Sequence, residues 1–192
     1  MYRITFMDVF IILVLVVIVF FYLKKNYGEV QFVQSEEDGQ KYLVKKLPDS
    51  QKAAEMLARI NKKLMTLVKH MVSKYPDNDD AQRLYENFNP ENVSEGLPDA
   101  GYTSYSINKG ERLILCIRQK DTNEFVNENV AMYVAIHELG HIAITEIGHT
   151  PYFWKTFKWL LEEAVSIGVY TKVDYAANNQ PYCGIHLSTS VI

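Results

Sequence analysis

The sequence predicts an α+β fold, in which helices pack around a small antiparallel hairpin behind an N-terminal transmembrane helix. Three observations predict it. An uncharged apolar run occupies residues 9–23, several later stretches repeat their apolar residues at helical spacing, and two short β-type segments flank a turn that contains glycine. A chain of 192 residues is long enough to bury one core, so we expect a single folded domain after the helix.

Charge and cysteine usage narrow the possible functions. The net charge of −3 and the pI near 6.0 give no basic field, so no nucleic-acid partner is expected. Cys116 and Cys183 lie far apart and form no C-x-x-C pair, which predicts two buried free thiols rather than a disulfide scaffold. Cys183 is also a candidate for an extra metal ligand.

The N-terminal segment, residues 1–25, is predicted to anchor the chain in a membrane. Its apolar run, extended across Asp8, reaches about twenty residues, the length that spans a bilayer. Lys24 and Lys25 follow directly where a signal peptide would carry a small-residue cleavage site, so we expect an uncleaved single-pass anchor. These lysines favour a domain on the cytoplasmic side, whereas Arg3 favours the opposite orientation. The lipid bilayer is thus an expected partner.

The polar residues 26–48 are expected to form a juxtamembrane linker that includes a short strand near residues 41–45, and the folded domain is expected at residues 49–192. Asp49 or Ser50 can cap the first helix of this domain.

That helix is predicted to reach about Tyr75, since its apolar residues recur every three or four positions until Pro76. His70 falls on its polar side and is expected to be solvated. A short helix over residues 81–88 and a loop over residues 89–100 should follow.

Residues 102–107 and 112–118 have β character, and the turn Asn108-Lys109-Gly110 between them predicts a hairpin. Residues 123–129 lead from this hairpin into the next helix.

That helix carries the motif His137-Glu138-Leu139-Gly140-His141. His137 and His141 are four residues apart, so both imidazoles can face one point, and zinc binds imidazole nitrogen at roughly 2.0–2.1 Å. Glu138 lies where a general base for a metal-bound water belongs. Gly148 is expected to end the helix, and His149 can then supply a third nitrogen. Three protein ligands with an open position are typical of catalytic zinc.

A last long helix should begin with Thr150 as its cap and Pro151 in its first position. Three residues remain alternatives to His149 as the third ligand. Glu162 and Glu163 lie on this helix, and His186 lies in the tail after it. The tail also holds three tyrosines, which are expected to pack, although a hydroxyl near the metal could stabilise an oxyanion: Tyr170, Tyr175 and Tyr182.

The segment HELGH…GHTPYFWKTFKWLLEEA resembles the WLM-type and SprT-like zinc metallopeptidases, and it is most similar to membrane-anchored members encoded by large DNA viruses. The resemblance covers roughly residues 102–183. It implies a zincin-like metallopeptidase domain with a Zn²⁺ cofactor held by His137, His141 and His149, and with Glu138 as catalytic base. It also implies that residues 114–117, or the strand paired with them, bind substrate as an added strand. Many WLM proteins have a shorter gap between the second and third histidines.

The expected function is therefore a membrane-anchored zinc metallopeptidase that hydrolyses a peptide or protein substrate by Glu138-assisted attack of zinc-bound water. Two alternatives stay open. One is a catalytically silent, zinc-stabilised structural or interaction module at a membrane, which closure of the fourth metal position by a side chain such as Cys183 would favour. The other is a hydrolase acting on a non-peptide amide, which would share the metal chemistry.

Overall fold

The structure is a computed structural model of the full chain that describes residues 5–27, 29–97 and 103–192. Its helices are α1 (Phe6–Tyr27), α2 (Ser50–Lys74), α3 (Asp79–Asn87), the short 3-10 helix η1 (Pro90–Asn92), α4 (Glu128–Ala143) and α5 (Pro151–Ser166). Its strands are β1 (Val30–Gln34), β2 (Lys41–Lys45), β3 (Val93–Glu95), β4 (Tyr105–Ile107), β5 (Arg112–Leu115), β6 (Gln180–Tyr182) and β7 (Ile185–Leu187). The α+β prediction is confirmed.

The main sheet has five strands in the order β1-β2-β3-β5-β4 and is mixed rather than antiparallel. The pairs β1–β2 and β4–β5 are antiparallel, whereas β2–β3 and β3–β5 are parallel. The strand β4 forms one edge of the sheet. It pairs with β5, and these two strands are the predicted hairpin. In that hairpin Asn108 and Lys109 both take positive φ, of 48° and 55°, which is the backbone of a tight hairpin turn.

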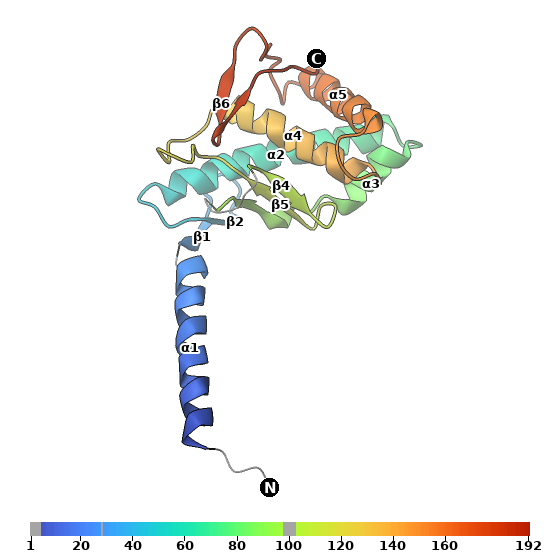
Figure 1. The fold of residues 1–192 in the computed structure, drawn as a ribbon. Coiled ribbons are helices and arrows are strands. Elements are labelled where there is room, and N and C mark those ends of the chain that lie inside the picture. The colour runs from blue at the N-terminus through green and yellow to red at the C-terminus, as the bar shows by residue number, and fades with distance from the viewer. Residues whose placement is uncertain (1–4, 28, 98–102) are drawn as a thin grey trace.

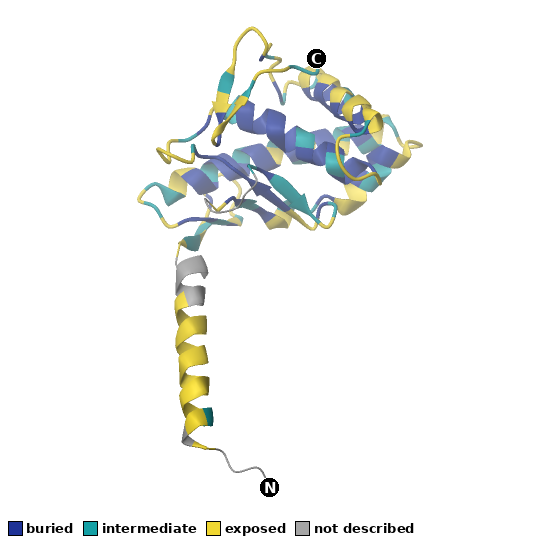
Figure 2. Cartoon of the chain, in the orientation of Figure 1, coloured by how far each residue is buried: buried dark blue, intermediate teal, exposed yellow. Residues whose placement is uncertain are grey.

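The helix α4 lies at the centre of the domain (Figure 1). It contacts α2, α3 and α5, as well as β4, β5 and β6. Its side chains are buried on most sides, as Figure 2 shows, which explains why its sequence is apolar nearly all round rather than amphipathic. The amphipathic α2 packs its apolar stripe into the same core. A helix enclosed in this way is a rigid support for a functional site.

The N-terminal prediction is wrong. The helix α1 forms, and the apolar side chains of residues 9–21 are exposed along it (Figure 2). In the part of the chain that the structure describes, however, no helix combines the length and the apolar character needed to cross a membrane, which overturns the single-pass anchor. The uncharged residues between Asp8 and Lys24 make only about 22 Å of helix, less than the roughly 30 Å of a hydrocarbon core.

The strand predicted near residues 41–45 is confirmed as β2, but two other stretches supply elements of the main sheet that were not predicted. Residues 26–48, expected to be a linker with that one strand, also supply β1, and residues 89–100, expected to be a loop, supply η1 and β3. Each strand has three to five residues, too short for an alternating pattern to stand out. The start of the predicted hairpin at Tyr102 lies outside the described residues.

Arg118 joins the sheet to the start of α2. Its side chain is buried, donates to Glu95 at 2.9 Å, and donates to the Asp49 carboxylate at 2.7 and 2.9 Å. Asp49 occupies the cap position of α2, but its carboxylate binds Arg118 instead of capping the helix.

The prediction of free thiols is also wrong, because Cys116 and Cys183 form a disulfide. Their Cα atoms are 6.3 Å apart, within the range of disulfides. The bond ties the end of β5 to the turn of the β6–β7 hairpin across 67 residues of sequence. A separation that long gives no sequence signal of proximity, and the bond removes Cys183 from the candidate metal ligands.

Candidate metal centre

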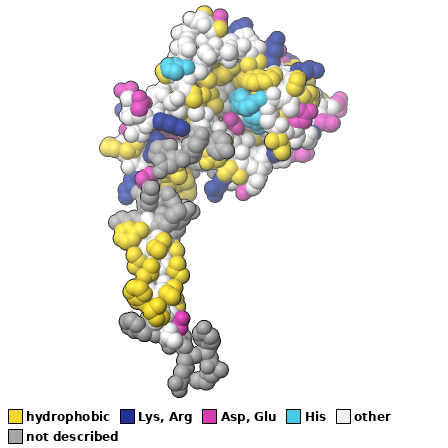
Figure 3. Space-filling model, in the orientation of Figure 1, with side chains coloured by type: hydrophobic (Ala, Val, Ile, Leu, Met, Phe, Trp, Pro, Cys, Tyr) yellow, Lys and Arg dark blue, Asp and Glu magenta, His cyan; other side chains and the backbone are white. Residues whose placement is uncertain are grey.

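His137, His141 and His149 converge on one point at the surface of α4. The Nε2 atoms of His137 and His141 are 3.2 Å apart, those of His141 and His149 are 3.2 Å apart, and those of His137 and His149 are 2.9 Å apart. Figure 3 shows histidine side chains in a recess on the face of the domain, beside hydrophobic side chains. The structure thus brings together the three residues that the sequence predicted as metal ligands.

The spacing of the three nitrogens fits a metal ion. Ligand nitrogens at roughly 2.0–2.1 Å from a tetrahedral zinc lie about 3.3 Å from one another, close to the observed spacing. Hydrogen bonding alone cannot account for the cluster, since a neutral imidazole has one N–H and cannot direct it at two neighbours. Burial and the neighbouring histidines lower the pKa of His137 to about 3 and that of His141 to about 4. Both rings are therefore neutral at pH 7, the form that binds metal.

Aromatic side chains of α5 hold the three rings in place. The His141 ring stacks on Phe153 with ring centroids 4.2 Å apart, and the His149 ring stacks on Trp154 at 5.5 Å. His137 meets Phe153 edge-on at 4.8 Å. Trp154 continues the apolar spacing of α5, which is typical of a core residue, but its side chain is 43% exposed. Its contact with His149 gives it a place in the site that the helical pattern did not reveal.

Gly140, inside the motif, lets α5 approach α4 this closely. A Cβ atom at this position would lie 3.1 Å from the Phe153 ring, a contact tighter than ordinary packing. The start of α5 matches the prediction: Thr150 is the cap, its hydroxyl accepts from the Phe153 N–H at 3.2 Å, and Pro151 takes the first position.

The end of α4 differs from the prediction. The helix stops at Ala143, and Gly148 lies farther on, in the loop that carries His149, with a φ of 84°. Side chains rather than a glycine satisfy the last carbonyl groups of the helix. Arg83 donates to the Ala143 carbonyl at 2.5 Å.

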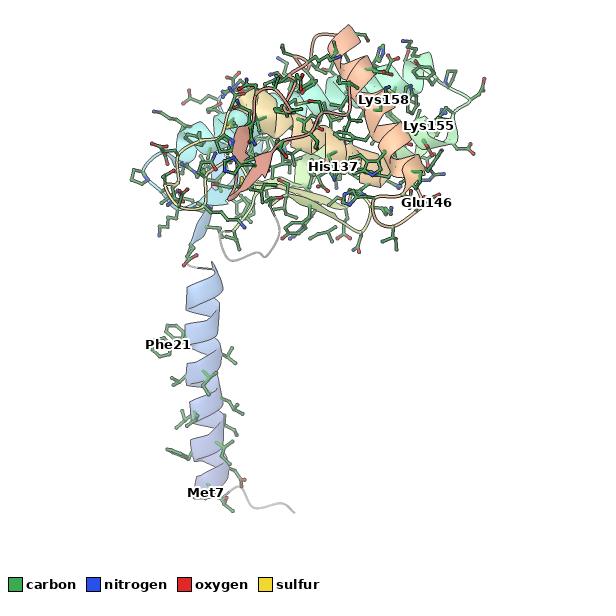
Figure 4. The ribbon with its side chains drawn as sticks, turned by 45° about the horizontal axis from the view of Figure 1, so that its top comes forward. Met7, Phe21, His137, Glu146, Lys155 and Lys158 are labelled. Carbon is green, nitrogen blue, oxygen red and sulfur yellow. A yellow bond between two sulfur atoms is a disulfide. The ribbon has the colours of Figure 1, made fainter. Side chains whose placement is uncertain are left out.

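Lys109, from the β4–β5 turn, holds the same region through three carbonyl groups. Its Nζ donates to His141 at 2.9 Å, to Ile144 at 2.9 Å and to Glu146 at 2.6 Å. The ammonium therefore holds both the last turn of α4 and the loop leading to His149. Figure 4 labels His137 on α4 and Glu146 in that loop. Sequence reasoning assigned Lys109 only to a turn, because contacts with distant carbonyl groups leave no residue pattern.

Glu138 lies beside the histidines with only 6% of its surface exposed. Burial raises the pKa of its carboxyl to about 8, although a hydrogen bond from the Ser106 backbone N–H in β4 lowers it in part. The carboxylate faces the same cleft as His137 and His141. It is therefore close to the candidate metal position without belonging to the histidine cluster.

The alternative third ligands are engaged elsewhere. Glu163 accepts from Lys74 at 2.8 Å, from the Tyr75 hydroxyl at 2.5 Å and contacts His70 Nε2 at 2.6 Å. Burial raises the pKa of Glu163, but these hydrogen bonds outweigh it and lower the pKa to about 2. His70 is thus a half-buried hydrogen-bond partner of Glu163 rather than the solvated residue that was predicted.

Glu162 is exposed and lies 3.9 Å from Lys158, while His186 contacts Asn179 on the β6–β7 hairpin. The three tyrosines of the tail are buried, as expected for packing: Tyr170, Tyr175 and Tyr182. Tyr182 also lines the cleft, where its hydroxyl lies 2.6 Å from the Ser104 hydroxyl.

Comparison with known proteins shows the family of this chain. The family model of the WLM domain matches residues 36–182, so the chain belongs to the WLM family and is a zinc-metallopeptidase-like domain. Among individual relatives, it is 30% identical over 189 residues to the uncharacterized protein R325 of Acanthamoeba polyphaga mimivirus, which covers 96% of each chain. The uncharacterized protein 136R of Invertebrate iridescent virus 6 is 35% identical over 85 residues, 43% of this chain and 46% of the relative.

A solved structure is also similar. The crystal structure of Wss1 from Saccharomyces cerevisiae aligns with 64% of this chain and 84% of its own, with 19% sequence identity and a TM-score of 0.43.

Proposed function

We propose that this chain is a zinc-dependent metallopeptidase, in which His137, His141 and His149 hold the metal and Glu138 is the general base. The observation that carries the proposal is the convergence of three imidazole nitrogens within 3.2 Å of one another, beside a buried glutamate on the same helix. Zinc, when bound, supplies a Lewis acid that polarises a carbonyl and makes a water more acidic near neutral pH. The family match supports the same reaction class.

Other residues of the chain have separate roles in this proposed reaction. Glu138 accepts a proton at its carboxylate and can return it to the leaving amine. The Ser106 N–H orients that carboxylate, and the aromatic side chains of α5 keep the three imidazoles from turning. An extended peptide can add along β4, because this strand forms the edge of the sheet and its residues line the cleft. The alternative considered from sequence, β5, lies inside the sheet.

A silent structural zinc module remains the rival proposal from the sequence, and a fourth protein ligand such as Cys183 would have favoured it. The donor cluster formed by the described residues consists of the three histidines, and Cys183 is in a disulfide. This donor set favours the peptidase, since catalytic zinc sites keep three protein ligands and one open position.

The test is hydrolysis of an unfolded protein by the zinc-loaded full chain, beside Glu138→Gln. We expect Glu138→Gln to keep its zinc and lose at least about 100-fold in turnover, the lower end of what a general base contributes. Glu162→Gln is the matched control, because Glu162 is an exposed glutamate on α5, and it should keep wild-type turnover. Undiminished turnover in Glu138→Gln at equal zinc content would refute the role of Glu138. No hydrolysis by the zinc-loaded wild type would refute the proposed activity.

A further inference from the structure

The cleft at the metal centre extends well beyond the histidines. Its volume is about 720 Å³, which is in the range of ligand-binding cavities. It follows one face of α4, where the lining residues recur at helical spacing: Tyr133, Val134, His137, Glu138 and His141. Tyr133 precedes His137 by four residues, so the cleft continues about 6 Å along the helix from the first histidine.

The part of the cleft beyond His137 has an apolar lining. The β6–β7 hairpin contributes Ile185 and Leu187 to it, and α4 contributes Tyr133 and Val134. Tyr133 packs edge-on against Phe157 at 5.2 Å and against Tyr175 at 4.9 Å, so its ring is fixed. Figure 3 shows hydrophobic side chains alongside the histidines on this face. We call this part of the cleft, lined by Tyr133, Val134, Tyr182, Ile185 and Leu187, the apolar pocket.

The polar atoms of the apolar pocket are already engaged. The Tyr182 hydroxyl lies 2.6 Å from the Ser104 hydroxyl, which in turn accepts from the Cys116 N–H at 2.9 Å. Burial raises the pKa of Tyr133 to about 12, so its hydroxyl stays neutral. Among the described residues lining the whole cleft, the cationic side chain is Lys109, whose ammonium binds three carbonyl groups near His141. An anionic group entering the apolar pocket would therefore lose water without gaining a partner, and the carboxyl that a cationic group would meet in the same cleft is that of Glu138, which the proposed reaction uses.

We propose that the apolar pocket is a specificity site that receives a large apolar side chain of the peptide substrate, next to the scissile bond. The proposal rests on the proposed peptidase function and names its substrate class. An extended peptide rises about 3.3–3.4 Å per residue, so a pocket about 6 Å from the first histidine lies within two residues of the reacting carbonyl. Alternate side chains of such a peptide point toward the same face, and one of them would face α4.

The hairpin offers a matched pair of positions for testing this proposal. Leu187 is half-buried and lines the apolar pocket, whereas His186, the preceding residue, is exposed and lies outside the cleft. Leu187→Glu places a carboxylate in the pocket, and His186→Glu places the same group on the other face of the strand. Leu187→Ala is a milder variant that widens the pocket without adding charge.

The experiment digests a randomised peptide mixture with the zinc-loaded full chain and identifies the cleavage sites by mass spectrometry. We expect one position near the scissile bond to favour Leu, Phe, Met or Tyr over Asp, Glu and Lys by at least about tenfold. Leu187→Glu should abolish this preference or shift it to Lys and Arg, and Leu187→Ala should shift it toward the largest aromatic residues. His186→Glu should keep the wild-type preference.

A second measurement separates the pocket from the activity. Zinc-loaded Glu138→Gln is exposed to the same mixture, and the retained peptides are sequenced. We expect the retained peptides to be enriched in apolar residues. In the Glu138→Gln background, Leu187→Glu should remove this enrichment and His186→Glu should keep it. That result supports the proposed specificity site even if the wild type cleaves nothing and the proposed function fails. Cleavage by the wild type without side-chain preference, or equal effects of Leu187→Glu and His186→Glu, would overturn the pocket while leaving the peptidase in place.

Discussion

The two ends of the cleft along α4 are built in different ways. The histidine end takes its donors from one stretch of sequence, residues 137–149, and its supports from α5 and Lys109. The apolar end combines α4 with a hairpin nearly 40 residues farther on, which a disulfide ties to β5. The difference suggests that the chemistry depends on local spacing along one helix, whereas recognition depends on how a distant segment is attached. The two ends should therefore respond separately to substitution.

The largest effect expected is on stability, from removal of the disulfide that holds the apolar end. Replacing both Cys116 and Cys183 with alanine frees a loop closed across 67 residues, which should lower the free energy of unfolding by roughly 4 kcal/mol. Denaturant unfolding of the variant beside the oxidised wild type measures this loss. A zinc titration on the same samples should give unchanged affinity, and a matching loss of zinc affinity would show that the two ends are not separate.

The next effect concerns the histidine end. His149→Ala should lower zinc affinity by more than about 100-fold, because losing a ligand costs more than losing a partner that orients one. Competition with a chromogenic chelator measures the affinity. His186→Ala is the control, since His186 is exposed and bonded to Asn179. If His186→Ala lost zinc and His149→Ala kept it, the third ligand would be misassigned.

Substitution of Lys109 tests whether residues that position the histidines also affect zinc affinity. Lys109→Met removes the ammonium that binds the carbonyl groups of His141, Ile144 and Glu146, and it should weaken zinc binding roughly 10- to 100-fold. Lys109→Arg should recover part of the loss. Lys155→Met, on the exposed side of α5 (Figure 4), should have no effect. Unaltered affinity in Lys109→Met would mean that the loop holds its shape unaided.

The smallest effect expected lies outside both ends of the cleft. Glu163→Gln should reduce the free energy of unfolding by about 1 kcal/mol at pH 7, since it weakens the hydrogen bonds with Lys74, Tyr75 and His70. The pKa of the folded carboxyl is depressed from 4.5 to about 2, so this stability is present above pH 4.5 and is lost as the pH falls toward 2.

Unfolding midpoints of wild type and Glu163→Gln should therefore converge in acid. Glu162→Gln, at the exposed neighbouring position, should match the wild type throughout. A loss of zinc affinity in Glu163→Gln would restore Glu163 as a candidate ligand.

The sequence predicted the parts of the molecule that depend on local spacing. The pattern of His137 and His141, the cap at Thr150 and the turn before Gly110 each follow from residues a few positions apart, and the structure has all three features. The convergence of His149 with this pair was predicted from its position after the helix, although the helix ends earlier than expected.

The parts that the sequence did not predict depend on contacts between distant segments. Three such features are the disulfide of Cys116 and Cys183, the contacts of Lys109 with carbonyl groups and the strand β1, each of which joins segments that carry no shared pattern. The membrane anchor failed for another reason. The apolar run reaches about twenty residues only when it is extended across Asp8, and its uncharged part, residues 9–23, is too short for a bilayer.

The most direct test of the metal centre is X-ray absorption at the zinc edge of the zinc-loaded full chain, beside His149→Ala. We predict three imidazole nitrogens at roughly 2.0–2.1 Å from the zinc in the wild type, and one fewer in the variant. A sulfur ligand at about 2.3 Å, or an imidazole count that His149→Ala leaves unchanged, would contradict it.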